Sequence, residues 1–204
     1  MDVLVPFAAA LLSVRLAAEL LRKHRARRAP ELVAWAASLG SFAAASAALA
    51  WGAAAGWDDR AFRAYYLFGG LLTAALLGGG SLLRAGLRAA GPAVLLYTGL
   101  AIGVALSVPI DPAVTGGSIP DATEHLAVFP ARVLALVGNI AGTVAAVGVA
   151  LTGLRRRRVG NSLIIGGVAV AAAGSALAGL GGGGGSFFTA VAAVLLYAGF
   201  VSRR

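Results

Sequence analysis

The sequence predicts an all-α integral membrane protein, a bundle of seven transmembrane helices. Of its 204 residues, 59% are hydrophobic and the mean hydropathy is +0.87, more than a water-soluble domain carries. The apolar residues form long runs, and the basic residues gather in alternate segments between them. Together these observations indicate several spans with a consistent orientation.

Seven apolar runs predict the spans. A helix needs about 20 apolar residues to cross the hydrocarbon core, and only helices or closed barrels satisfy their backbone there. None of the runs alternates apolar and polar residues as a membrane strand does. In a single membrane domain, residues 1–204, the predicted spans are Val3–Leu21, Glu31–Gly56, Phe62–Leu83, Pro92–Val108, Leu126–Leu154, Val159–Leu180 and Phe187–Val201.

Basic residues predict the orientation. Most of the 17 lysines and arginines lie in 22–28, 84–88, 155–158 and 203–204, whereas the opposite segments are richer in aspartate and glutamate. The positive-inside rule therefore predicts an N-terminus outside and a C-terminus in the cytosol. The first run is followed by positive charge and not preceded by it, so it predicts an uncleaved span. The bias toward arginine, alanine and glycine suggests a GC-rich bacterium and its cytoplasmic (inner) membrane.

Composition excludes several functions. There is no cysteine, which excludes disulfides, thiolate metal sites and cysteine nucleophiles. A net charge of +9 in a soluble protein would suggest nucleic acid. Here the charges lie between apolar runs, so the predicted partners are the bilayer and its anionic lipids, with no nucleic acid. No catalytic motif and no retinal-binding lysine in the last span are present, and we expect neither a cofactor nor enzymatic activity.

Small residues spaced four apart predict helix–helix contacts. Such spacing lets membrane helices approach closely, and it occurs in spans two, four, five and six, for example at Gly99 and Gly103 and at Gly138 and Gly142. The stripes either close one bundle or join copies in a homo-oligomer. Gly78, Gly79 and Gly80 in span three have two interpretations: a helix broken beside a solute pathway, or a helix that ends early or packs unusually close to a neighbour.

Few polar residues lie within the spans, and ionisable or amide groups there are candidates for function. Arg15 and Glu19 are four apart on the first helix, so they either pair in the bundle interior or extend to the cytosolic surface. Asn139 and Thr143 lie near the middle of span five. They either bond a neighbouring helix or line a polar pathway.

The segment before span five holds the outer-face candidates Asp111, Asp121, Glu124, His125 and Arg132. Carboxylates and a histidine can bind a cation, but these have no recognisable ligand spacing, and we predict no metal site. Asp121 with Glu124 three residues later predicts a helix N-cap that opens span five. Arg132 is expected to meet one of these acids.

Four short stretches, Tyr65–Gly70, Pro109–Pro112, Gly138-Asn139 and Gly160–Ile164, resemble a family of uncharacterised bacterial seven-helix membrane proteins. That resemblance implies the topology and no activity. Thr73–Leu83, with its Gly-Gly-Gly-Ser, is locally similar to the glycine-broken pore helix of trimeric intracellular cation (TRIC) channels. It departs from them because the motif falls in the third helix and no Arg-Asp pair follows.

Two functional hypotheses follow from the sequence. The first is a channel or transporter for an ion or small solute, with Gly78–Gly80, Asn139 and Thr143 near the pathway. The second is a membrane scaffold or interaction module that binds a partner protein or anionic lipid through its basic cytosolic loops.

Overall fold

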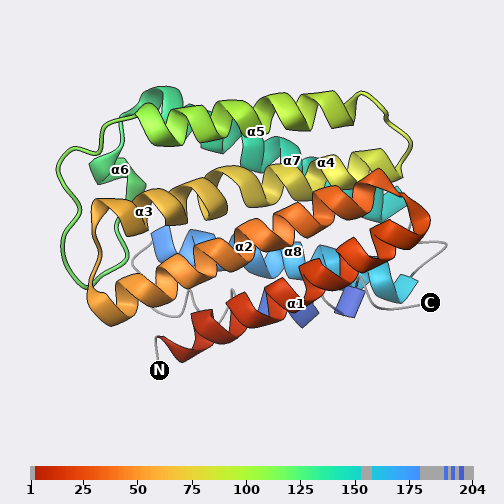
Figure 1. Ribbon diagram of the computed structural model, residues 1–204, viewed down its shortest axis with the longest axis horizontal. Coiled ribbons are helices and arrows are strands. Elements are labelled where there is room, and N and C mark those ends of the chain that lie inside the picture. The colour runs from red at the N-terminus through yellow and green to blue at the C-terminus, as the bar shows by residue number, and fades with distance from the viewer. Residues whose placement is uncertain (1–2, 153–157, 180–190, 193, 196–197, 200–204) are drawn as a thin grey trace.

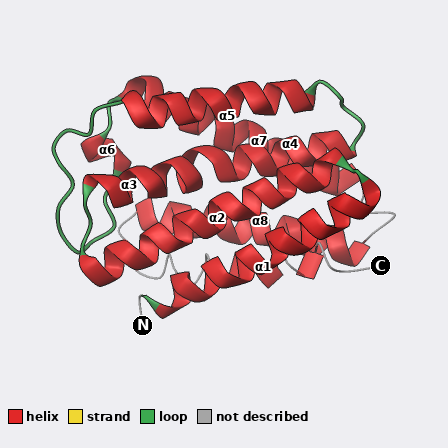
Figure 2. Ribbon diagram, viewed as in Figure 1, coloured by secondary structure: helices red, strands yellow, loops and turns green. Residues whose placement is uncertain are grey.

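The described chain is built from helices that run side by side (Figures 1 and 2). The computed structural model describes all residues except 1–2, 153–157, 180–190, 193, 196–197 and 200–204. Within the described residues there is no β-strand, only an isolated bridge between Trp57 and Gly116. The prediction of an all-α fold is confirmed.

Long helices cover the apolar runs in the described part of the chain. They are α1 (Leu4–Arg27), α2 (Pro30–Ala55), the continuous stretch of α3 (Asp59–Tyr65), η1 (Tyr66–Leu72) and α4 (Thr73–Arg84), then α5 (Ala90–Ser107), η2 (Val128–Arg132) with α7 (Val133–Thr152), and α8 (Arg158–Gly179). A four-residue helix, α6 (Ala122–His125), precedes η2. In the described part of the chain, five helical stretches are long and apolar enough to cross a membrane: Leu4–Arg27, Pro30–Ala55, Asp59–Arg84, Ala90–Ser107 and Val128–Thr152.

The last predicted span lies mostly outside the described residues. Of Phe187–Val201, the described residues 191–192, 194–195 and 198–199 are helical. Gly199 lies against α8, because a Cβ on it would meet Ile164 and the carbonyl of Gly160. Much of the predicted basic segment 155–158 and the basic C-terminus also fall outside the described residues.

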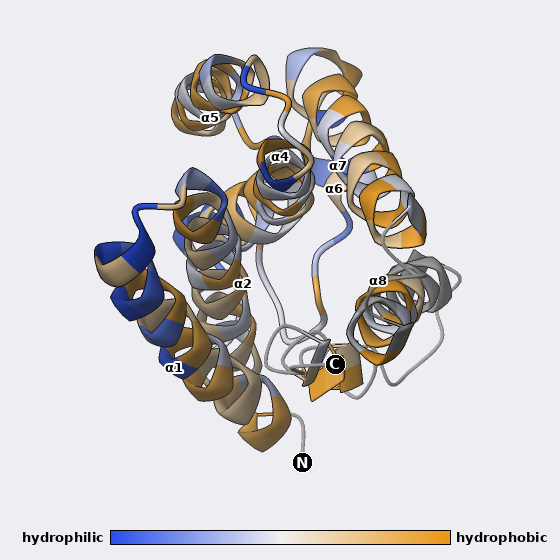
Figure 3. Ribbon diagram, turned by 90° about the vertical axis from the view of Figure 1, so that its right-hand side faces the viewer, coloured by the Kyte–Doolittle hydropathy of each residue, from blue (hydrophilic) through white to orange (hydrophobic). Residues whose placement is uncertain are grey.

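Helix α4 lies at the centre of the described bundle. Seen along the helices, it sits between α2, α5 and α7, while α1 packs on α2 and α8 packs on α7 (Figure 3). One hydrophobic cluster joins α1, α2, α4, α7 and α8 through Leu16, Trp35, Leu77, Ala146 and Val168. The middle of the bundle is therefore largely apolar.

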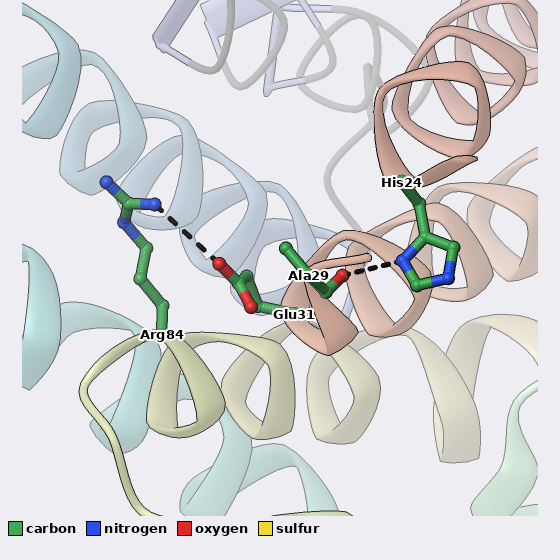
Figure 4. A network of polar contacts seen from close by, with 4 residues as sticks. All are labelled: His24, Ala29, Glu31 and Arg84. Atoms are coloured by element: carbon green, nitrogen blue, oxygen red, sulfur yellow. Dashed lines mark hydrogen bonds and ion pairs between the residues drawn. The ribbon is translucent and has the colours of Figure 1, made fainter. Parts of the chain in front are cut away.

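One end of the bundle is basic. The loop between α1 and α2 and the loop between α4 and α5 both lie at this end (Figure 1), and Glu31 of α2 lies 4.0 Å from Arg84 of α4 (Figure 4). The His24 ring donates to the carbonyl of Ala29 at 2.8 Å and fixes the first of these loops (Figure 4). We call this the basic end, and its exposed basic side chains are Arg22, Lys23, Arg25, Arg27, Arg28, Arg84 and Arg88.

At the opposite end, residues 108–121 form a strap across the helix ends. The Val114 N–H donates to Asp59 Oδ1 at 2.8 Å, and the Trp57 N–H donates to the Gly116 carbonyl at 2.8 Å. Beneath the strap, Phe62, Val104 and Leu126 are buried in a second apolar cluster. The strap is thus tied to the start of the third span, which carries α3.

Candidate functional site

The third span changes its helical geometry halfway along. Between the regular helices α3 and α4, residues Tyr66–Leu72 form a π-helical turn, and the Thr73 N–H bonds the carbonyl of Phe68, five residues back. The Thr73 hydroxyl donates to the same carbonyl at 2.7 Å. The turn contains Gly69 and Gly70, whose weak preference for α-helix makes such rewinding cheaper. Turns of this kind recur at functional sites.

Asn139 of α7 binds this turn directly. Its Nδ2 donates to the carbonyl of Gly70 at 2.7 Å and to the carbonyl of Ala135 in its own helix at 2.8 Å. Because both partners are acceptors, the amide group can have only this orientation. Asn139 therefore ties the rewound part of the third span to α7, as the interhelical alternative predicted.

Tyr97 of α5 makes a second tie beside it. Its hydroxyl lies 3.0 Å from the carbonyl of Leu71 and 3.1 Å from that of Leu134. The single hydroxyl proton is shared between them. A Cβ on Gly138 would collide with the Tyr97 hydroxyl, so the missing side chain at Gly138 makes room for this ring. We call Tyr97 and Asn139, with the carbonyls that they bind, the polar bridge.

A third helix, α2, bonds the first residue after the turn. The Ser38 hydroxyl of α2, only 3% exposed, donates to the carbonyl of Thr73 at 2.7 Å. The rewound segment is thus hydrogen-bonded by side chains of α2, α5 and α7. Thr143, the other predicted pathway residue, is half-buried one turn beyond Asn139.

Gly78, Gly79 and Gly80 do not break the helix. They are buried inside the continuous helix α4, and each faces a different neighbour. A Cβ on Gly78 would strike the backbone of Gly142 in α7, one on Gly79 would strike Val94 of α5, and one on Gly80 would strike the Trp35 ring of α2. The broken-helix interpretation is wrong at this position, because α4 is continuous through all three glycines. The glycines instead let α4 approach three helices closely.

Arg15 and Glu19 are not paired with each other. Glu19 Oε1 lies 2.7 Å from Lys23 Nζ, one turn farther along α1, and the Arg15 side chain is exposed. The order of the charges along α1 explains why Glu19 pairs with Lys23 and not with Arg15. A glutamate placed four residues before a lysine interacts better with the helix dipole than a basic residue placed before a glutamate. Of the two alternatives from the sequence, the interior ion pair is absent, and Glu19 pairs instead toward the basic end.

Asp121 caps a helix, but not the helix of span five. Its Oδ1 accepts the Thr123 N–H at 2.8 Å at the start of α6. Hydrogen bonds from the backbone and side chain of Thr123 lower the pKa of the Asp121 carboxyl, and the charge of Arg132 adds to this effect. Leu126 is extended after α6 and Phe129 is extended within η2, so α6 is separate from the regular helix α7. No ion pair within 4.0 Å joins Arg132 to an acid among the described residues.

His125 fastens the strap. Its Nδ1 donates to the carbonyl of Pro112 at 2.8 Å, and its own carbonyl accepts the Asp111 N–H at 3.0 Å. The ring also packs edge-on against Phe62, with centroids 5.6 Å apart. Glu124 is exposed. In the described part of the chain, His, Asp and Glu side chains form no group of three that could hold a metal ion.

A water-sized pocket lies beneath the strap. Arg63 of α3 lines it, and its Nη1 donates to the carbonyls of Ala105 and, at 2.8 Å, Val108 at the end of α5. A cation here stabilises the negative end of the α5 dipole. The other walls are Phe62, Tyr66, Val104, Ile110, Leu126 and Ala131.

Ser38, Arg63 and Tyr97 are not among the candidate site residues that the sequence predicted. Hydroxyl groups are common within apolar runs, so only the contacts in the structure show which of them bond another helix. Arg63 resembled an ordinary charged residue of a loop. The available signal was Tyr97 two residues before the GxxxG spacing of Gly99 and Gly103. No family model, no curated protein and no solved structure matches this chain.

Proposed function

We propose that the chain is a seven-span protein of the bacterial cytoplasmic membrane, with the strap outside and the basic end in the cytosol, that passes an ion or small solute. The topology is supported by the five described helical stretches able to cross a membrane and by the exposed basic side chains at one end.

The observation that carries the transport function is the rewound middle of the third span. Membrane proteins tolerate non-α backbone at this depth where it lines a pathway or is buried in protein, and transporters bind solutes beside such interruptions. Here the turn is surrounded by an amide, a phenol and a hydroxyl from three helices. These are groups that can exchange a backbone partner for a polar solute.

In this proposal the described conformation is closed. Asn139 and Tyr97 join the third span to α7, and the glycine contacts hold α4 against its neighbours. Passage then requires the polar bridge to open. The similarity of Thr73–Leu83 to the TRIC pore helix is consistent with such a role but is not needed for it.

Flux into proteoliposomes tests the proposal. The purified chain is reconstituted and challenged in turn with monovalent cations, protons, small anions and neutral polar metabolites. We expect flux of at least one class, reduced at least tenfold by Asn139→Leu, because this variant removes the amide that would bind a polar solute once the bridge has opened. Thr152→Val is the matched control, because the Thr152 hydroxyl is exposed and bonds only the Val149 carbonyl of its own helix. No flux of any class above empty liposomes, with a folded protein, would reject transport.

The basic end supports a second candidate, an interaction module for anionic lipid or an acidic partner protein. Seven exposed basic side chains gather at the ends of α1 and α4 and in the loops that follow them, and each contributes about 1 kcal/mol at an anionic surface. Co-purification of a stoichiometric partner, lost when Arg25, Arg27 and Arg28 are changed to glutamine, would favour this function. Retention of flux in the same variant would favour transport.

A further inference from the structure

The π-helical turn amounts to one surplus residue in the third span. An α-helix turns about 100° and rises 1.5 Å per residue, and a π turn accommodates an extra residue within an otherwise regular helix. The turn therefore sets how α4 is rotated relative to α3. Removing it without shortening the chain would rotate one of the two segments by about one residue step.

Helix α4 is the segment that cannot rotate. Gly78 faces the backbone of Gly142, and Gly79 and Gly80 face Val94 and Trp35. One residue step would place Leu77 where Gly78 now lies, at a contact that has no room even for a Cβ. Any change in the turn must therefore be taken up by α3 and the strap attached to it.

Helix α3 is held by its buried Phe62 ring and by polar contacts that can be exchanged. Arg63 reaches the end of α5 with a long side chain, and the strap is tied to α3 by single hydrogen bonds such as that from the Val114 N–H to Asp59. The water-sized pocket lies between these two segments and α5. Movement of α3 would change the shape of the pocket, because Phe62 and Arg63 line it.

The surplus residue is not required for packing. A chain shortened by one residue within the turn would keep α3 and α4 in their present rotation, joined by ordinary α-helix. The turn is instead maintained by two glycines and by hydrogen bonds from Ser38, Tyr97 and Asn139. A feature that costs helix stability and is held by neighbouring side chains is suited to motion.

We propose that the π turn is the hinge of a gate at the strap end: α3 rotates on it while α4 stays docked, the polar bridge is the latch, and the pocket beneath the strap is the entrance that widens. This inference rests on the proposed transport function and specifies how its pathway opens.

Distances between spin labels in nanodiscs test the hinge in the full-length chain, which has no native cysteine. One labelled pair, Arg60→Cys with Leu136→Cys, measures α3 against α7. The matched control pair, Ala85→Cys with Leu151→Cys, measures the docked end of α4 against α7. We expect a broad or two-peaked distribution for the first pair and one narrow peak for the control pair. Deletion of Gly69 should remove the second population from the first pair.

Equal, narrow distributions in both pairs of the unshortened chain would overturn the hinge, as would an unchanged broad distribution in a folded Gly69 deletion. If the deletion does not fold, the double variant Tyr97→Phe, Asn139→Leu decides: it should shift the first pair toward the second population, and no shift overturns the proposal. Flux is measured on the same samples. Two populations without flux would reject transport and leave the hinge, whereas flux with one population would reject the hinge alone.

Discussion

Helices α7 and α5 carry the same sequence pattern with different outcomes. In α7, Gly142 lies so close to α4 that a Cβ would strike the Ala74 backbone. In α5, Gly99 and Gly103 have the same spacing, yet nothing lies within 4 Å of a Cβ on either. Small residues therefore mark where close approach is possible, and the number of surrounding helices decides where it occurs. Polar residues also differ in their contacts: Asn139 bonds the third span, whereas Thr152 bonds only its own helix.

The largest expected effect comes from filling the α4–α7 contact. Gly142→Leu places a side chain against backbone atoms that cannot move independently, so the cost should reach or exceed the upper end of the roughly 1–3 kcal/mol typical of overpacking. We expect loss of a monodisperse peak in detergent and a strongly lowered Tm.

Gly103→Leu in α5 is the matched variant, and it should leave the Tm and the elution volume unchanged. If it instead altered the elution volume as a change of mass would, α5 would be a contact between copies, and the homo-oligomer left open by the sequence would gain support. Equal destabilisation by both variants would contradict the difference between the two helices.

The next largest effect concerns the polar bridge. Asn139→Leu removes the bonds to Gly70 and Ala135, and interhelical bonds in membranes contribute about 0.6–2 kcal/mol. Tyr97→Phe should cost less, because one shared proton is lost. Unfolding titrations in mixed micelles measure both. Thr152→Val, whose hydroxyl bonds only its own helix, should change the free energy of unfolding by less than either, and equal effects of all three would contradict the bridge.

The helices were predictable because burial in lipid imposes long apolar runs, but the rewound turn was not. Hydropathy shows Phe62–Leu83 as one run with two glycine clusters. The cluster that rewinds, Gly69-Gly70, is the one that neighbouring hydrogen-bond donors surround, and the cluster that stays helical is the one that neighbouring helices press against. Asn139 was placed correctly near mid-span, but its partner lies 69 residues away, and periodicity within one helix carries no information at that separation.

The two histidines allow a comparison of the loops at opposite ends of the bundle. His125 bonds the strap across 13 residues, whereas His24 bonds within a short loop across five. His125→Gln should speed hydrogen exchange of the Asp111 and Val114 amides about 2- to 10-fold, the equivalent of one lost hydrogen bond. His24→Gln should leave those two amides unaffected. Equal rates in both variants would show that the strap does not depend on His125.

The smallest effect separates Glu19 from Arg15, which share a helix face. Glu19→Gln breaks the pair with Lys23, and exposed pairs spaced four apart contribute about 0.3–0.5 kcal/mol. Arg15→Gln should cost nothing measurable, because among the described residues no acid lies within 4.0 Å of it. The difference should shrink in high salt, which screens exposed charges. A larger, salt-insensitive loss for Arg15→Gln would mean instead that Arg15 has a buried partner when the protein is in a bilayer, which would favour the interior ion pair, the other alternative left open by the sequence.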